Sequence, residues 1–325
     1  MVTQDYRFNP KLRPIRWVGA EHARPVGRVG RVHDAGHHAF GVMLGTHSTL
    51  IRINPVCHEI RHPCGMTQDN PTGLDAYKPA EIAHLVETAG VAKAKLGLAQ
   101  TLCLAVLAGA FIGFGGAAYT MVMTGADPGF GPARLLGGVV FSLGLILVVV
   151  GGAELFTGNA LMVMAAVDRK ITRAALFRNW GIVFVGNLIG AVGLAVAFGM
   201  TGILDGPMGA TARAIADGKA TLTPIEALVR GALCNALVCL AVWLTFAART
   251  AAGKILAILF PISGFVMLGL EHSIANMYLF PQGIAAGSDV TACAIVGNLF
   301  WVTLGNIIGG AGGVALSYRF AYLRG

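Results

Sequence analysis

A stretch in the C-terminal half of the chain, GLEHSIANM at positions 269–277, sets three chemically capable side chains in an apolar run. Glu271 and His272 can hold or transfer a proton, and Asn276 can both donate and accept hydrogen bonds. An ionisable side chain inside a membrane span costs roughly 2.5 to 3.5 kcal/mol when charged. His272 is the only histidine after His84, so we interpret it as a functional residue able to exchange a proton.

The elements around this stretch are those of a membrane protein. Hydrophobic residues make up 55% of the chain and charged residues only 12%, which is more apolar than a soluble globular domain. The net charge is +8, but Lys and Arg form no basic stripe, which argues against a nucleic-acid partner. Apolar runs of about 20 residues predict an all-α protein with six transmembrane helices at 96–123, 136–166, 176–203, 224–247, 255–279 and 291–318.

An internal repeat relates the two halves of the membrane domain. GAELFTGN at 152–159 and GLEHSIAN at 269–276 both follow the pattern G-x-E-x-x-x-x-N. NWGIVFVGNLIG at 179–190 and NLFWVTLGNIIG at 298–309 form a second pair, offset by 119 residues against 117 for the first. Each copy covers three spans, so the second copy enters the membrane from the opposite side. Two inverted three-helix repeats predict a substrate site near the membrane midplane.

The repeated motif also predicts that the second and fifth spans are broken. It lies late in each span and contains residues that favour caps and irregular backbone, such as Thr157 and Gly158. Non-helical backbone at membrane depth must be buried in protein or line a cavity, so two breaks predict a shared pathway. We expect four residues to cap the broken helices whatever the cargo: Glu154, Asn159, Glu271 and Asn276.

The N-terminal region has a different character. Residues 1–65 show neither helical periodicity nor the apolar core of a signal peptide, and we predict that they are a non-native or disordered extension, with translation starting at Met66. Residues 66–95 predict a polar leader and an amphipathic helix on the cytoplasmic surface, with one face formed by Ile82, Leu85, Val86 and Ala89. The cluster Cys57, His58, His62 and Cys64 matches no common zinc spacing, so we predict no metal site.

The distribution of basic residues predicts the orientation. The loops that follow the second and fourth spans, and the C-terminal end, are richer in Lys and Arg than the alternate loops and include Arg169, Lys170 and Arg319. The positive-inside rule places these segments in the cytoplasm. We therefore expect a channel domain at 96–319 in the inner (cytoplasmic) membrane, with both termini and the tail 320–325 in the cytoplasm.

Five segments in this order resemble the signature segments of the formate/nitrite transporter family: GAELFTGN, RNWGIVFVGNLIG, CNALVCLAVW, GLEHSIANM and WVTLGNIIGG. The similarity covers roughly Asp75 to Arg319. It implies an aquaporin-like protomer, a homopentamer with a separate pore in each subunit, and a small monovalent anion as cargo. It implies no cofactor and no enzymatic activity.

The resemblance also implies which residues line the pore. Matching positions give a central histidine, a threonine at the first break, two asparagines and a vestibule lysine: His272, Thr157, Asn235, Asn306 and Lys219. The apolar constrictions correspond to Phe141, Leu145, Phe156, Val238 and Phe265; without the resemblance, such residues at helical spacing are ordinary packing. We expect Phe141 and Phe265 to bracket His272 from opposite sides.

A mechanism follows as a hypothesis. Lys219 would raise the local concentration of anions, but a bare anion crosses apolar rings only at high cost. His272, with Thr157 and Asn306 as hydrogen-bond partners, would stabilise the anion or pass it a proton, so transport should depend on pH. We interpret Arg230 and Glu226 as a structural ion pair.

Other functions fit less well. An aquaporin-type channel for neutral solutes is compatible with broken helices, but the chain contains no Asn-Pro-Ala triplet. An intramembrane enzyme would need a second catalytic group or metal-ligand spacing on neighbouring spans, and the sequence offers neither. Among anions, formate is the first choice and nitrite the second, while hydrosulfide, acetate and lactate stay open.

Overall fold

The computed structural model describes residues 76–323, and that part of the chain is helical, with a single isolated bridge between Ala76 and Ala248. The first half contains α1 (Pro79–Ala94), α2 (Leu98–Met123), α3 (Gly131–Gly151), the short η1 (Gly158–Met162) and α4 (Val163–Val167), α5 (Arg173–Gly199) and η2 (Ile203–Asp205). The second half contains α6 (Pro207–Ala220), α7 (Pro224–Ala247), α8 (Ala251–Met267), α9 (Ser273–Ala285), α10 (Ala292–Ile307), the π-helical η3 (Ile308–Leu316) and α11 (Ser317–Tyr322).

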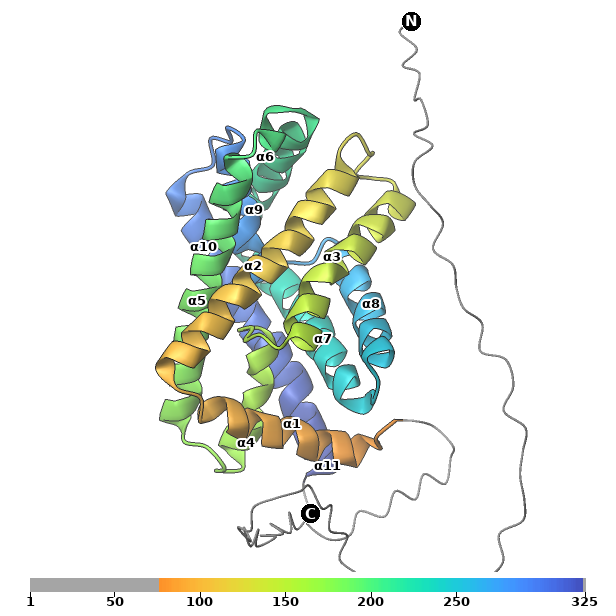
Figure 1. Ribbon diagram of the computed structural model, residues 1–325, viewed down its shortest axis with the longest axis vertical. Helices are drawn as coiled ribbons and strands as arrows, with labels where there is room; N and C mark the ends of the chain where they lie inside the picture. Colours follow the sequence, from red (N-terminus) through yellow and green to blue (C-terminus); the bar gives the residue numbers. More distant parts are fainter. Residues whose placement is uncertain (1–75, 324–325) are drawn as a thin grey trace, which may run out of the picture. The chain divides into compact units, whose positions relative to one another are not determined.

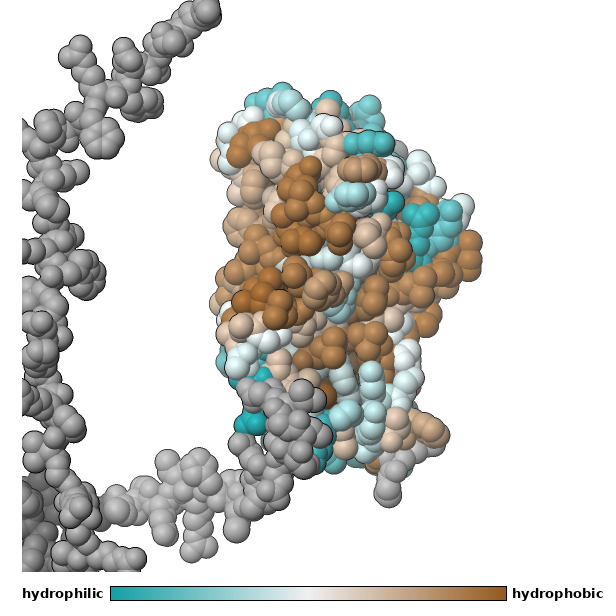
Figure 2. Space-filling view, turned by 90° about the vertical axis from the view of Figure 1, so that its right-hand side faces the viewer, coloured by the Kyte–Doolittle hydropathy of each residue, from teal (hydrophilic) through white to brown (hydrophobic). Residues whose placement is uncertain are grey.

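The helices form a bundle that suits a membrane. Five of them are long and apolar enough to cross it, namely α2, α3, α5, α7 and the continuous run α10–η3–α11. The sixth crossing is made by α8 and α9, since α8 has 17 residues and α9 only 13. Apolar side chains cover the middle of the face in Figure 2, and polar ones gather mainly at its two ends. The chain is therefore a multi-pass membrane protein with the predicted all-α architecture.

Local sequence signals explain where the membrane helices begin. A threonine precedes α5, α7, α8 and α10, and its hydroxyl accepts a hydrogen bond from the backbone N–H three residues later. This satisfies one of the four N–H groups that a helix start leaves unpaired. At α7 the Glu226 carboxylate closes a capping box with Thr223, accepting from its backbone N–H at 2.9 Å. Glu226 thus serves the helix end, and the expected ion pair with Arg230 does not form among the described residues.

Both predicted breaks are present. α3 ends at Gly152, whose φ of +81° is in the left-handed region that favours glycine, and helix resumes at Gly158. The fifth span breaks in the same way at Gly269, with φ +69°, and resumes at Ser273 after the N-cap residue His272. The second and fifth spans are therefore broken at repeat-related glycines, as the motif predicts.

The inverted repeat extends further upstream than the sequence motifs indicate. The stretch 204–223, expected to be a loop, contains the 14-residue helix α6, which packs against α9 and buries Met208, Ala212 and Ala216. Like α1, it begins with a proline and carries a lysine in its last turn. α1 precedes α2 as α6 precedes α7, and the two helices lie at opposite ends of the bundle (Figure 1). Each repeat therefore consists of one end helix followed by three spans.

α1 lies across one end of the bundle and contacts η1, α4, α7 and α11. Ile82 and Val86 are buried as predicted, whereas Leu85 is exposed because the packed face is completed by Ala83 and Gly90. The extension 1–65 and the leader 66–75, including the cysteine and histidine cluster, lie outside the described residues.

Two ion pairs fasten this end of the bundle. The Lys170 ammonium contacts Glu87 of α1, and the Arg319 guanidinium contacts Asp168 in the loop after α4. Partial burial opposes ionisation of Asp168, but the hydrogen bonds from Arg319 outweigh it and hold the pKa of that carboxyl below its usual range.

Candidate pore and its two cavities

The second break is organised by the Glu271 carboxylate. Lys219 at the end of α6 donates to Oε1 and Oε2 of Glu271, with Nζ to oxygen distances of 2.8 and 3.0 Å. Asn276 donates to Oε2 at 2.7 Å and to Asn298 Oδ1 at 2.8 Å. Asn298 in turn donates to the backbone carbonyl of Lys219 at 3.0 Å. A closed set of contacts thus compensates a carboxylate that is 4% exposed.

The first break repeats this arrangement around Glu154. Lys93, in the last turn of α1, lies with Nζ 2.5 Å from Oε1 of Glu154. Asn159 donates to Oε2 at 2.7 Å and to Asn179 Oδ1 at 2.9 Å. Each break therefore holds one carboxylate, one lysine and two amides. In the described contacts, Glu154, Asn159, Glu271 and Asn276 bind lysine and amide side chains and not the backbone N–H groups of the resumed helices, so they support the breaks without capping them as predicted. Lys93 and Asn179 belong to the same network.

A second pair of asparagines ties the irregular backbone to neighbouring helices. Asn306 donates to the carbonyls of Gly231 and Glu271, at 2.8 and 3.0 Å, and accepts from the Ser273 N–H at 2.9 Å. Asn187 makes the same three contacts in the first repeat, with the carbonyls of Ala105 and Glu154 and the N–H of Phe156. Motif matching places Asn306 in the pore, but its side-chain contacts are those of a backbone brace. Asn187 is recognisable from the shared G-N-x-I-G pattern.

Asn235 joins the first break to α10. Its side-chain amide donates to the carbonyl of Thr157 at 3.2 Å and to that of Asn306 at 2.6 Å. Neither Asn235 nor Thr157 lines any of the three cavities described below, but the Thr157 hydroxyl contacts His272, which lines two of them. Asn235 therefore holds the backbone at Thr157 in place by hydrogen bonding.

His272 and Thr157 meet at the centre. His272 Nδ1 accepts a hydrogen bond from the Ala275 N–H at 3.1 Å, so it caps α9 with its own ring. An accepting Nδ1 carries no proton, which leaves the proton of the neutral ring on Nε2. Nε2 lies 2.9 Å from Thr157 Oγ1, so the ring donates to this hydroxyl. The hydroxyl proton of Thr157 then remains available for another acceptor.

The asymmetry between the repeats lies at this histidine. The position equivalent to His272 in the first motif is Leu155, which is buried and apolar. The two breaks therefore share their carboxylates and amides but contribute different groups to the centre.

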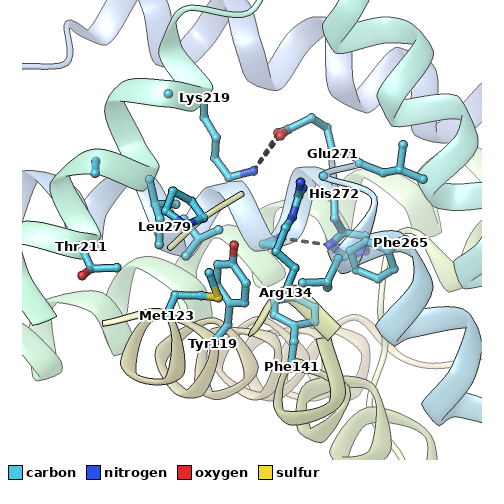
Figure 3. A pocket seen from close by; sticks show the side chains of 18 of the residues that line it. Tyr119, Met123, Arg134, Phe141, Thr211, Lys219, Phe265, Glu271, His272 and Leu279 are labelled. Atoms are coloured by element: carbon cyan, nitrogen blue, oxygen red, sulfur yellow. Dashed lines mark hydrogen bonds and ion pairs between the residues drawn. The ribbon is translucent and has the colours of Figure 1, made fainter. Parts of the chain in front are cut away.

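Three cavities lie in series through the protomer. One of about 590 Å³, the α6-side cavity, is lined by Lys219, Glu271 and His272 among others, and Figure 3 shows its side chains. Another of about 320 Å³, the α1-side cavity, is lined by Lys93, Glu154 and Leu155 among others. A space of about 10 Å³ shares residues with both, and a cavity of that size holds one water molecule at most. The path is therefore wide at both ends and narrow in the middle, where apolar side chains and His272 line it.

The narrow middle segment contains most of the predicted constriction residues. Its lining consists of Ile112, Phe141, Leu145, Leu155, Val238, Ile262, Phe265 and His272. Phe156, also predicted there, instead packs against Trp180 and Phe184, with ring centroids 6.0 and 5.1 Å away. The preceding residue, Leu155, occupies the constriction. The sequence fixes neither residue's direction, because the backbone between Gly152 and Gly158 is not helical.

The two pore phenylalanines lie together and do not bracket His272. The Phe141 and Phe265 rings meet edge to face at 5.6 Å between centroids. Phe265 stacks on the His272 ring at 5.9 Å. Both rings also border the α6-side cavity, so they form one apolar gate on that side of the histidine.

The charges of the two cavities differ from expectation. Lys219 lines the α6-side cavity as predicted, but its ammonium is paired with Glu271. Two further cations, Arg134 and Arg230, line the same cavity. The α1-side cavity is lined by a further cation, Lys254, in addition to the Lys93–Glu154 pair. Residues 76–323 contain no group of three His, Cys, Asp or Glu side chains arranged to hold a metal ion.

Comparisons with known proteins agree with this architecture. Residues 80–320 match the family model described as formate/nitrite transporter. The chain is 46% identical over 249 residues to the uncharacterized transporter YrhG of Bacillus subtilis (strain 168), covering 75% of this chain and 93% of the relative. It is 40% identical over 282 residues to the formate channel FocA of Escherichia coli (strain K12), covering 80% and 98%.

Solved structures give the same result. An FNT family ion channel superposes with a TM-score of 0.68 at 28% identity, covering 74% of this chain and 98% of its own. A pentameric formate channel with formate bound superposes with a TM-score of 0.64 at 40% identity, covering 70% and 98%. These relatives are channels and transporters and not enzymes, and the chain described here belongs to the formate/nitrite transporter family.

Proposed function

We propose that the protein carries small monovalent anions, formate first and nitrite second, through a pore in each protomer of a homopentamer. Formate is favoured because relatives at 40% identity include a channel named for formate and a pentameric structure with formate bound. Nitrite has the same bent shape and single charge, and the lining residues do not separate the two. Hydrosulfide, acetate and lactate are further candidates within the family.

The observation that carries this proposal is the pair His272 and Thr157 beside a narrow apolar segment between two wider cavities that contain charged side chains. A carboxylate loses its hydration in such a segment at a cost of several kcal/mol or more. The neutral acid crosses at a much smaller cost. With Nε2–H donating to Thr157, the Thr157 hydroxyl can donate to the anion. The neutral ring has only this one proton, so its N–H and the Thr157 hydroxyl act as hydrogen-bond donors that hold the anion, and the proton that neutralises the anion comes from water in the adjoining cavity.

This arrangement supports proton-coupled and pH-dependent transport. Lowering the external pH raises the proton supply in the cavity that opens to the outside, so uptake of formate should increase as the external pH falls. Protonation of Nδ1 would break the cap on the Ala275 N–H, so we propose that His272 stays neutral, keeps Nδ1 as an acceptor and donates a hydrogen bond from Nε2 while the anion takes its proton from water.

The test is labelled-formate uptake into proteoliposomes over a range of pH. His272→Phe keeps the ring volume but removes both nitrogens, and we expect at least a ~10-fold loss of uptake and a weaker pH dependence, because removing one positioned hydrogen-bond donor from a water-excluded site costs about 10²-fold or more. Thr157→Ser should retain uptake and Thr157→Val should lose it. The matched control is His84→Phe, an exposed histidine of α1. Unchanged uptake and an unchanged pH profile in His272→Phe would exclude this role. If unlabelled hydrosulfide or lactate reduced labelled-formate uptake more strongly than nitrite did, the proposed order of substrates would be wrong.

We further propose that the α1 end faces the cytoplasm of a cell bounded by an inner membrane. That end carries Arg169, Lys170, Arg173 and Arg319, and the rule that cytoplasmic loops are basic then sets the orientation. Both termini would be cytoplasmic, with the channel domain at 96–319.

A further inference from the structure

Each cavity contains a lysine that is already occupied. Lys219 is bound to both oxygens of Glu271, and Lys93 to one oxygen of Glu154. Each pair is formally neutral, so it contributes little net attraction for an incoming anion. The net positive charge of the cavities must come from other side chains.

Arg134 and Lys254 supply this charge at corresponding places in the two repeats. Arg134 is the fourth residue of α3 and lines the α6-side cavity, and Lys254 is the fourth residue of α8 and lines the α1-side cavity. α3 and α8 are the first halves of the two broken spans. Arg134 precedes Gly152 by 18 residues and Lys254 precedes Gly269 by 15, a difference close to one helical turn. The repeat thus sets one cation at each mouth.

In the described part of the chain, neither Arg134 nor Lys254 pairs with another side chain that would account for a charge at its position. Between residues 76 and 323, the side chains of Arg134 and Lys254 form no ion pair or hydrogen bond with another residue. Neither helix has an acidic residue in its first turn. A cation in the first turn opposes the helix dipole at a cost of roughly 0.3 to 1 kcal/mol. At both mouths this unfavourable interaction with the helix dipole is not offset by an ion pair or a hydrogen bond of the side chain within the described residues.

The guanidinium of Arg134 lies close to the constriction. A Cβ added to Gly269 would lie 2.6 Å from Arg134 Nη2, so the guanidinium rests on the turn that breaks the fifth span. Figure 3 shows it among Tyr119, Phe141 and Glu271, on the side of the gate that faces the cavity. Its planar fork of donors suits two oxygens of one small anion, whereas the Lys254 ammonium is a point charge.

We propose that Arg134 and Lys254 are the anion-capturing residues of the two mouths, and that Lys219 and Lys93 serve as counter-ions of the break carboxylates. This inference rests on the proposed function. It assigns the first contact of the anion at the α6 side to a bidentate group and at the α1 side to a monodentate one. Entry from the α6 side should therefore discriminate more strongly for bent oxyanions.

The first arm of the test needs no transport. In a background with Cys57, Cys64, Cys103 and Cys293 each replaced by serine, Leu222→Cys reports on the α6-side cavity and Val149→Cys on the α1-side cavity, since the two positions line these cavities. The measured quantity is the rate of modification by an anionic methanethiosulfonate relative to a cationic one. Arg134→Gln should lower this ratio roughly 5-fold or more at Leu222→Cys only, and Lys254→Gln at Val149→Cys only, because one unit charge is removed nearby.

The second arm measures labelled-formate uptake in right-side-out and inside-out membrane vesicles. Arg134→Gln should raise the half-saturating formate concentration ~5-fold when the α6 side faces the label, and Lys254→Gln should do so for the opposite side. Arg134→Lys should restore the charge but not the preference of formate over hydrosulfide. Arg173→Gln, an exposed cation at the start of α5 that lines neither cavity, is the charge-matched control.

The outcomes separate the two proposals. If both variants behave like Arg173→Gln in the reporter arm, the capture assignment is wrong. If the reporter ratios change as expected but wild-type vesicles take up neither formate nor nitrite, the assignment of capture stands and the proposed cargo is wrong.

Discussion

At the scale of single residues, the structure pairs Lys219 with a buried carboxylate. The family resemblance points to a free vestibule cation, but the ammonium is 2.8 and 3.0 Å from the two oxygens of Glu271. A buried carboxylate without a partner is strongly destabilising, and an occupied lysine has little charge left to offer an anion. The same reasoning applies to Lys93 and Glu154, although Lys93 is more exposed, with 30% of its side chain accessible against 16% for Lys219.

A double-mutant cycle tests the pairing. Lys219→Met leaves Glu271 buried and uncompensated, and Glu271→Gln leaves the ammonium without a carboxylate, so each should lower the free energy of unfolding by about 3 kcal/mol. The double variant should be less destabilised than the sum of the single variants, with a coupling of at least ~1 kcal/mol. Chemical unfolding in detergent micelles measures all four proteins. Additive losses would show that the two side chains do not stabilise each other.

At the scale of helices, the breaks depend on the asparagines that brace them. Asn187 and Asn306 each satisfy two carbonyls and one N–H that the interrupted helices leave unpaired. Lipid offers no alternative partner for these groups. The close approach of the neighbouring helices adds to this: a Cβ on Gly190 or Gly309 would lie 1.9 Å from a carbonyl oxygen of the facing helix. The G-N-x-I-G pattern therefore encodes a brace and a helix contact together.

Replacing a brace should unfold the protein before it changes selectivity. Asn306→Leu removes three hydrogen bonds and leaves their backbone partners buried, which should cost about 3 kcal/mol or more. Asn187→Leu should cost a similar amount, since its contacts are the same. Melting temperature in detergent and the yield of folded protein are the readouts. A stable Asn306→Leu variant with altered anion selectivity would instead support a direct pore role for Asn306.

At the scale of the whole molecule, inversion gives each side of the membrane its own copy of the same mouth. α6 and α1 close opposite ends, and each delivers a lysine to the nearest break (Figure 1). The copies are not identical. Arg230 adds a second cation to the α6-side cavity, while its counterpart, the residue whose carbonyl accepts from the Glu154 N–H, is the apolar Leu104. The α6 side should therefore attract anions more strongly.

Impermeant labelling checks the proposed orientation. In a background with Cys57, Cys64, Cys103 and Cys293 each replaced by serine, Asp289→Cys places a thiol in the exposed loop between α9 and α10, and Ala251→Cys places one at the exposed start of α8. A membrane-impermeant maleimide should label Asp289→Cys in intact cells and Ala251→Cys only after permeabilisation. The reverse pattern would mean that the α1 end faces outward.

Much of the architecture is encoded locally and could be predicted. Apolar runs define the spans because burial in lipid requires about 20 apolar residues, and the repeated G-x-E-x-x-x-x-N motif marks both breaks. α6 could not be predicted in this way, because a short amphipathic helix rich in alanine and glycine has no long apolar run. The roles of Lys93, Arg134 and Lys254 also escaped, since none of them lies within a repeated motif.

The sequence by itself determined the class of protein, the six spans, the inverted repeat, the two breaks and the single central histidine, because each depends on residue type and spacing along the chain. Only the tertiary structure decided which charges are paired and which side chains face the path. It brought Lys219 to Glu271 across 52 residues, turned Leu155 and not Phe156 toward the constriction, and joined Phe141 to Phe265 in one gate. These outcomes depend on the direction of irregular backbone and on contacts between distant helices, which spacing along the chain does not specify.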